Sequence, residues 1–262
     1  MTQLKDAVVL ITGATGGFGQ ELTRQLLQAG SRLILTDLDG DRLAQQRAEM
    51  QQASASGEVL TDLVADLSTS EGCERLYQQV QALQTPVDIL INNAGIAVFG
   101  RMDEVPPEEW ERLMSINLLA PMQLSRLFGA EMIARRSGHI VNLSSAAGWV
   151  ALVGLTHYSA SKFGLRGFSE GLQAEVKPYN VRVTVVYPFF SRTPILQSKR
   201  YGTLAKTASP LPDRLITDPA LVMSRTLRGI ERNQLHVFPD RIASTIHWAK
   251  RFAPRLLNWI DI

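Results

Sequence analysis

Short apolar runs alternate along the chain with longer stretches in which apolar residues recur every three or four positions. The first run is AVVLI at Ala7–Ile11, and Phe18, Leu22 and Leu26 follow it at helical spacing up to Gly30. Continuous apolar runs are typical of strands buried on both faces, and the wider spacing is typical of amphipathic helices. The pattern predicts strands at 7–11, 33–36, 59–65, 88–91, 138–143, 181–187 and 235–238, and further helices at 42–52, 71–83, 107–136, 158–176 and 219–231.

This alternation predicts the fold class. Strand–helix–strand units with right-handed crossovers place helices on both faces of a parallel sheet. We therefore expect an α/β, Rossmann-type, doubly wound parallel sheet of about seven strands, formed as a single domain by residues 1–240. Residues 191–218 lack clear periodicity and contain Pro194, Pro210 and Pro212. They follow the sixth strand at the edge where ligands bind, so we expect either a mobile substrate lid or a surface loop.

The C-terminal segment, 241–262, extends past the last predicted strand. It mixes Trp248, Phe252 and Trp259 with basic residues such as Arg251 and Arg255. An amphipathic basic segment of this kind is suited to peripheral membrane contact, to an oligomer contact or to packing on its own domain. We expect packing or an oligomer contact in preference to membrane contact.

Composition mainly excludes classes of function. The 262 residues are 45% hydrophobic, and a formal net charge of only +2 does not indicate a nucleic-acid partner. Cys73 is the single cysteine, so we expect no intrachain disulfide and no metal site, and a reducing compartment. The N-terminus lacks a signal-peptide layout, and no apolar run approaches the ~20 residues of a membrane span. We expect a cytoplasmic protein, with membrane association through the C-terminal segment as the alternative.

A glycine-rich turn, TGATGGFG at Thr12–Gly19, separates the first strand from the first helix. Glycines there let the backbone approach a pyrophosphate, and the helix N-terminus supplies amide donors. Asp37 ends the second strand, where a carboxylate accepts hydrogen bonds from adenosine ribose hydroxyls and repels a 2′-phosphate. The turn has no Lys or Arg and Leu38 follows Asp37, so we expect NAD rather than NADP, although nearby Arg42 keeps NADP open. A plain turn, or a methyltransferase that binds S-adenosylmethionine, fits these residues as well.

Polar motifs follow the later strands. NNAG at Asn92–Gly95 closes the fourth strand, NLSSAAG carries the fifth strand into Ser145, and HYSASK places Tyr158 and Lys162 four residues apart. Residues i and i+4 share a helix face, so a phenol and an ammonium can act together there, the ammonium lowering the phenol's pKa from about 10. Taken alone, HYSASK is also an ordinary helix start, and Asn117 is an ordinary solvent-facing polar residue.

Seven motifs together carry a resemblance. TGATGGFG, Asp37, ADL at 65–67, NNAG, Asn117, NLSSAAG and YSASK occur in the order and spacing of the short-chain dehydrogenases/reductases, over about residues 5–240. The chain resembles the single-domain branch of that family. The resemblance implies an oxidoreductase that transfers a hydride between a nicotinamide cofactor and a secondary alcohol or ketone, and it suggests a homodimer or homotetramer.

The resemblance also implies roles for individual residues. Tyr158 would be the general acid–base, Lys162 would lower its pKa and bind the nicotinamide ribose, Ser145 would hold the substrate oxygen, and Asn117 would support a proton relay. The cofactor contacts that it implies are Gly13, Thr15, Gly17, Phe18, Gly19, Asp37, Asp66, Leu67, Asn93, Gly95, Tyr158, Lys162 and Thr193.

One position departs from the family pattern. The family reads Pro-Gly after the sixth strand, whereas this chain reads YPFFSRT, with Phe189 in place of the glycine and Thr193 where the family has Thr. We expect Phe189 to disturb the usual backbone path beside the nicotinamide and to add an aromatic wall. Other apolar residues are expected around the same cleft: Phe99, Trp149, Val150, Leu152, Val153, Leu155 and Phe190.

These residues suggest a lipophilic substrate, steroid-, retinoid- or fatty-chain-like; alternatively, they pack the loop or a subunit interface. A non-catalytic, dinucleotide-binding regulatory protein on the same fold is the second hypothesis for function. The complete set of Asn117, Ser145, Tyr158 and Lys162 argues against it, and the motifs after residue 90 argue against a methyltransferase. We expect His139 and His236 to be structural, and His157 either structural or in contact with substrate.

Overall fold

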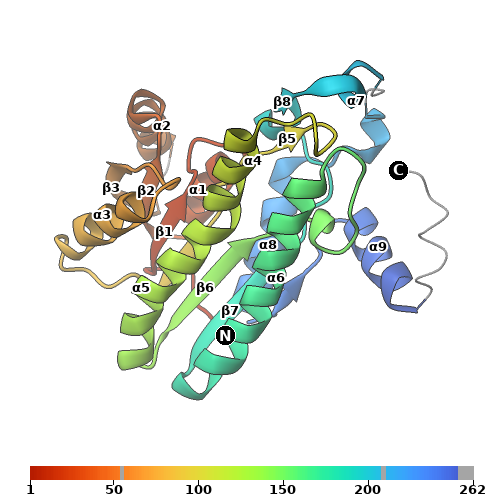
Figure 1. The fold of residues 1–262 in the computed structure, drawn as a ribbon. Coiled ribbons are helices and arrows are strands. Elements are labelled where there is room, and N and C mark those ends of the chain that lie inside the picture. The colour runs from red at the N-terminus through yellow and green to blue at the C-terminus, as the bar shows by residue number, and fades with distance from the viewer. Residues whose placement is uncertain (54–55, 208–210, 253–262) are drawn as a thin grey trace.

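The computed structural model describes residues 1–53, 56–207 and 211–252 as alternating strands and helices around one central sheet (Figure 1). Within these residues, seven parallel strands form one sheet in the order β3-β2-β1-β4-β6-β7-β9. They are β1 (Val8–Thr12), β2 (Arg32–Asp37), β3 (Glu58–Val64), β4 (Ile89–Asn92), β6 (Gly138–Leu143), β7 (Val181–Val186) and β9 (His236–Val237). The order reverses at β1, between β2 and β4, which confirms the predicted doubly wound Rossmann-type sheet.

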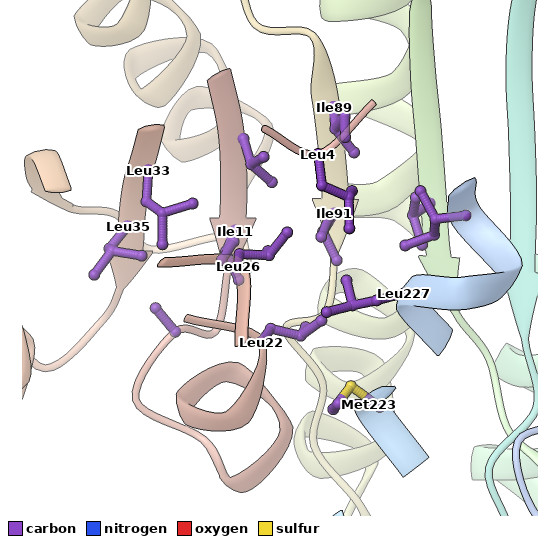
Figure 2. Close-up of a cluster of buried hydrophobic side chains, with 14 of the residues drawn as sticks. Leu4, Ile11, Leu22, Leu26, Leu33, Leu35, Ile89, Ile91, Met223 and Leu227 are labelled. Carbon is purple, nitrogen blue, oxygen red and sulfur yellow. The ribbon is translucent and has the colours of Figure 1, made fainter. Parts of the chain in front are cut away.

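Helices cover both faces of the sheet. One face carries α1 (Gly17–Gln28), α2 (Gly40–Ala53) and α8 (Pro219–Glu231), and the other carries α3 (Ser70–Gln81), α4 (Pro107–Met114), α5 (Ala120–Ala134) and α6 (Thr156–Val176). Figure 2 shows Leu22 and Leu26 of α1 and Leu227 of α8 against Ile11 and Ile91 of the sheet. A fully buried leucine contributes about 1.5–3 kcal/mol relative to an exposed one, so packing on the sheet holds these helices in place.

The helix expected at 107–136 is interrupted by a π-helical turn, η1 (Ser115–Leu119), between α4 and α5. The Ala120 N–H donates to the Ser115 carbonyl, five residues back. Asn117 lies within this turn, and its amide bonds to the backbone of Ile96 instead of facing solvent. One extra residue in one turn hardly alters the spacing of apolar positions, so the sequence pattern does not reveal it.

Residues 191–218 contain short elements: η4 (Pro194–Gln197), β8 (Lys199–Arg200), α7 (Gly202–Thr207) and η5 (Asp213–Leu215). Strand β8 pairs in parallel with β5 (Val98–Phe99) in a small second sheet. Glu109 of α4 holds the same segment, because its Oε1 accepts hydrogen bonds from Lys199 Nζ at 2.5 Å and from Tyr201 OH at 2.9 Å. Residues Lys199–Tyr201 are therefore held by both backbone and side-chain contacts.

The C-terminal segment begins with α9 (Arg241–Phe252), and its residues 253–262 lie outside the described residues. Asp240 starts the helix by accepting a hydrogen bond from the Ala243 N–H at 2.7 Å. His139 and His236 are structural as expected: His139 is buried between Thr2 and Thr184, and His236 Nδ1 bonds to the Tyr187 hydroxyl. None of the helices in the described part of the chain is both long and apolar enough to span a bilayer.

Candidate active site

A cleft of about 940 Å³ opens at the carboxyl ends of the strands. Its volume is near the upper end of the range for ligand pockets, about 300–1,000 Å³. Residues from the glycine-rich turn and a large set of apolar residues line it. The expected site residues on its wall are Gly13, Thr15, Gly17, Phe18, Asp37, Asp66, Leu67, Asn93, Gly95, Ser145, Tyr158 and Thr193. Gly19, Asn117 and Lys162 lie behind this wall.

Three glycines of the turn stand where a side chain would have no room. Gly13 has a φ of 65°, and a Cβ on it would lie 2.7 Å from Ala94 Cα. A Cβ on Gly17 would lie 2.6 Å from Thr193 Cγ2, and one on Gly19 would collide with the Gly13 carbonyl. No side chain caps α1, so the first N–H groups of the helix lack a side-chain partner. A helix start with this geometry is a binding site for an anion such as a pyrophosphate.

Two polar side chains hold the turn against the neighbouring strands. Asn93 Nδ2 donates to the Thr12 carbonyl at 2.9 Å. Asp37 Oδ2 accepts hydrogen bonds from Thr15 N at 2.8 Å and Thr15 Oγ1 at 2.7 Å, and its Oδ1 accepts one from Leu38 N. The Asp37 carboxylate is therefore held in one orientation on the wall of the cleft.

The neighbouring part of the cleft carries charges of both signs. Asp66 Oδ1 accepts hydrogen bonds from Ser68 Oγ at 2.7 Å and Ser68 N at 2.9 Å, and these bonds hold the pKa of Asp66 below its usual value. Arg42 and Arg112 also line the cleft. Arg112 was not expected from the sequence, where it is one of several charged residues on the exposed face of α4.

The π-helical turn brings Asn117 to Lys162. Asn117 is fully buried: its Oδ1 accepts from Ile96 N at 2.9 Å and its Nδ2 donates to the Ile96 carbonyl at 2.9 Å. A Cβ built on Gly95 would lie 3.3 Å from Asn117 Oδ1 and 3.6 Å from Lys162 Nζ. Gly95 therefore lets the backbone pass close to both polar atoms with no side chain between them. Ser161, which sequence reasoning missed, also contacts Asn117 Nδ2, at 3.3 Å.

Tyr158 and Lys162 lie together on one face of α6, as their spacing predicts. Lys162 Nζ lies 5.6 Å from the centroid of the Tyr158 ring and donates to the Leu143 carbonyl at 2.8 Å. Burial lowers the pKa of Lys162 to about 8. Burial raises the pKa of Tyr158 to about 12, and a hydrogen bond from the side chain of Ser145 opposes that rise. The lowering of the phenol's pKa that the spacing suggested is thus not what burial produces here: the pKa of Tyr158 moves upward.

Ser145 is positioned by the end of β6. Its side chain caps the short 3₁₀ turn η2 (Ala146–Gly148), accepting from Ala147 N at 3.1 Å. Its hydroxyl also lies 3.4 Å from the Pro188 carbonyl at the end of β7. Ser145 therefore reaches the cleft from the end of β6, and Tyr158 reaches it from α6. Both hydroxyl groups line the same cavity.

Phe189 fits its position without backbone strain. Its backbone φ angle is not positive, so this position does not need a glycine. Its N–H donates to Asp240 Oδ2 at 2.8 Å, and its ring packs edge-to-face on Phe190 at 4.8 Å. Both rings line the cleft. The expected aromatic wall is present, supported by a hydrogen bond to the residue that begins α9.

The apolar half of the cleft is lined as expected, with one correction. Phe99, Val150, Leu152, Val153 and Leu155 line it, together with Ile195, Leu196, Leu204 and Ile246, which the sequence did not indicate. The expectation for Trp149 was wrong: this ring lies 4.5 Å from His247 and only 3.3 Å from the Arg166 guanidinium, away from the cleft. The η2 turn directs Trp149 toward α9.

Other candidate groups take structural positions. His157 is buried, and its Nε2 bonds to the Val98 carbonyl at 2.8 Å, behind strand β5. Cys73 is buried in α3, which raises the pKa of its thiol to about 11. Within residues 1–53, 56–207 and 211–252, no three His, Cys, Asp or Glu side chains gather in a way that could hold a metal ion.

A sequence model of the short chain dehydrogenases matches residues 7–203. The chain belongs to the short-chain dehydrogenase family. The match spans the glycine turn, the π-helical turn and the Tyr158–Lys162 pair, so the geometry described above lies within the region that defines the family.

Individual short-chain dehydrogenases show how far the similarity extends. The 3-ketodihydrosphingosine reductase of Bos taurus is 37% identical over 84% of this chain, and the match covers 65% of that longer protein. Epidermal retinol dehydrogenase 2 of Mus musculus is 31% identical over 94% of this chain and 78% of its own length. A short-chain dehydrogenase from Sphingobium yanoikuyae, solved in complex with NADPH, has a TM-score of 0.82 at 27% identity and covers 97% of this chain and 96% of its own.

Proposed function

We propose that this protein is an NAD-dependent oxidoreductase that transfers a hydride between the cofactor and a lipophilic secondary alcohol or ketone. The observation that carries the proposal is the position of Tyr158 and Ser145, with Lys162 behind them. The two hydroxyl groups line a cleft that the glycine turn and a large set of apolar side chains also line. A dinucleotide-binding regulatory protein has no chemical need for this set.

The residues present fit a nicotinamide dinucleotide. The uncapped start of α1 and the glycine turn would hold its pyrophosphate, and the Asp37 carboxylate would accept hydrogen bonds from the adenosine ribose. Lys162 would bind the nicotinamide ribose, and Thr193, packed on Gly17, would contact the carboxamide end. When bound, the nicotinamide supplies the hydride donor or acceptor, and the protein supplies orientation and proton transfer.

In the direction of ketone reduction, Tyr158 donates its phenolic proton to the substrate oxygen. The phenol carries this proton at neutral pH because burial raises the pKa of Tyr158 to about 12. Release of the proton therefore depends on a neighbouring positive charge that favours the phenolate. Ser145 Oγ hydrogen-bonds the same oxygen and orients it toward Tyr158. The Lys162 ammonium then stabilises the phenolate that forms. In alcohol oxidation the proton returns to Tyr158 from the substrate hydroxyl.

Asn117 has a supporting role in this proposal. Its amide fixes the π-helical turn against Ile96, close to the buried Lys162. After ketone reduction, a water molecule bound near Asn117 would pass a solvent proton to Lys162, which would return a proton to the Tyr158 phenolate. Asn117 therefore acts through Lys162 and does not touch the substrate.

Asp37 should determine the preference for NAD. Its carboxylate would repel the 2′-phosphate of NADP, although Arg42 on the same cleft offers a competing attraction. We expect Asp37→Ser to lower kcat/KM with NAD and raise it with NADP, changing the NAD/NADP ratio by about tenfold or more, since each good charged contact contributes about 1.5–3 kcal/mol. Steady-state kinetics with both cofactors measure this ratio. Asp41→Ser, a change of the same kind in the first turn of α2, is the matched control and should leave the ratio unchanged.

The substrate class follows from the apolar half of the cleft. A substrate that enters this half would meet the aromatic rings of Phe99, Phe189 and Phe190 and the branched side chain of Leu152. We expect kcat/KM to rise with chain length or ring size across a panel of secondary alcohols, because each buried CH₂ contributes about 0.8 kcal/mol, close to a fourfold change. Initial rates with steroid, retinoid, long-chain and polyol alcohols test this. Equal or faster turnover of small polyols would contradict the proposed substrate class while leaving the oxidoreductase proposal intact.

A further inference from the structure

The outer face of α9 exposes two large aromatic side chains. Trp248 is 55% exposed and Phe252 is 70% exposed. Their rings are stacked, with centroids 5.3 Å apart and planes 11° apart. The pair therefore forms one apolar surface on the outside of the molecule, in a place where neither ring contributes to the core.

The inner face of the same helix is firmly packed, which fixes the direction of the outer face. Ala243 is buried, and the His247 ring stacks on Phe238 at 4.3 Å and meets Trp149 edge-on at 4.5 Å. Ile246 lines the cleft. The expected packing of the C-terminal segment on its own domain is thus provided by one side of α9, and it leaves Trp248 outward-facing.

The charges on α9 all have one sign. Arg241, Lys250 and Arg251 lie on the helix, and its sequence RIASTIHWAKRF contains no acidic residue. Within the part of the chain that the structure describes, these three side chains form no ion pair, and the Arg251 guanidinium lies 5.9 Å from the Phe252 ring centroid. Unpaired cations around an exposed aromatic pair complement an anionic, amphipathic surface. A surface of this kind is the headgroup region of a bilayer that contains anionic lipids.

We propose that the outer face of α9 docks on an anionic lipid bilayer, with Trp248 and Phe252 at the level of the headgroups and Arg241 and Arg251, the cations on the same side of the helix, against the lipid phosphates. Trp is enriched at that depth in membranes because its ring is amphipathic. Val153, which lines the cleft, is also 67% exposed. This inference goes beyond the proposed oxidoreductase activity and does not depend on it.

Vesicle co-sedimentation of the full-length protein, without cofactor or substrate, tests the docking. The vesicles contain either phosphatidylcholine alone or phosphatidylcholine with phosphatidylserine. We expect the wild type to bind the anionic vesicles. Trp248→Ser/Phe252→Ser should weaken that binding about tenfold or more. Arg241→Glu/Arg251→Glu should weaken it at least about 25-fold, because each cation near an anionic surface contributes about fivefold.

The matched control is Tyr179→Ser. Tyr179 is 42% exposed and also has an arginine guanidinium over its ring, that of Arg136 at 6.0 Å, but it lies in the turn that follows α6. This variant should bind the vesicles like the wild type. Thermal unfolding checks that every variant folds.

Three results would overturn the docking proposal. The wild type could fail to bind anionic vesicles, or the Trp248/Phe252 double variant could bind as tightly as the wild type. Alternatively, the wild type could fail to bind vesicles while the double variant has a smaller oligomer mass than the wild type in analytical ultracentrifugation. That result would assign the outer face of α9 to a contact with a second copy of the chain. Loss of dehydrogenase activity with vesicle binding intact would contradict only the proposed function.

Discussion

Tyr158→Phe is expected to abolish turnover while leaving cofactor binding intact. The substitution removes a single oxygen atom, so the apolar packing of the ring on the cleft wall is retained. It also removes the proton that the proposed mechanism transfers to the substrate oxygen, and general acid–base groups contribute about 10²- to 10⁴-fold to rates. Steady-state rates of ketone reduction give the loss in kcat, and quenching of protein fluorescence by the cofactor gives its affinity.

Tyr77→Phe is a matched control for this experiment. Tyr77 also loses a hydrogen bond on substitution, the one its hydroxyl donates to Glu131, but it lies on α3, outside the cleft. This control should change stability without changing kcat. If Tyr158→Phe retained the wild-type rate, the proton would have to come from another group, and the assignment of Tyr158 as the general acid–base would be wrong.

Lys162→Met should reduce turnover by a similar factor and should also change the pH profile. Burial lowers the pKa of Lys162 from 10.5 to about 8, so the ammonium is lost as the pH rises through about 8. The phenol of Tyr158, with its pKa near 12, remains protonated over that range. We therefore expect kcat/KM for ketone reduction by the wild type to fall above pH 8, because kcat/KM reports groups of the free enzyme. The residual activity of the variant should not show this fall.

The control for Lys162→Met is Lys177→Met. Lys177 is exposed just after the end of α6, in the 3₁₀ turn η3 (Lys177–Tyr179), and lies away from the cleft. This variant should keep both the wild-type rate and the fall above pH 8. A decline at the same pH in Lys162→Met would show that a different group titrates, and would remove Lys162 from the proton-transfer step.

The fold was largely predictable because its strands are buried on both faces. All five residues of VVLIT in β1 and all four of ILIN in β4 are buried, and such runs stand out in a sequence. Strands β5 and β8 have two residues each, too short to show a period, and neither was predicted. The sequence pattern also did not reveal the π-helical turn at Ser115–Leu119, because one additional residue in a single turn barely changes the spacing of the apolar positions.

The candidate site was likewise predictable only in part. The spacing of Tyr158 and Lys162 predicts a shared helix face, and the structure places both groups together. Asn117 alone suggested a solvent-facing residue, and only the resemblance to a family gave it a role. Trp149 was misplaced because an apolar residue on a loop can face either side, and its contact with His247 depends on α9, which is distant in sequence. Ile246 was missed because nothing in the C-terminal segment marks it as facing the cleft.

The carboxylate of Asp240 joins two parts of the molecule that experiments would often treat separately. One of its oxygens accepts the Phe189 N–H on the wall of the cleft, and the other accepts the Ala243 N–H at the start of α9. A protein shortened at residue 241 would lose the second partner, and Trp149 would lose its contact with His247. Shortening the chain would therefore disturb the reaction site and the lipid-facing helix in one step, so single-residue replacements such as Trp248→Ser are the cleaner way to separate them.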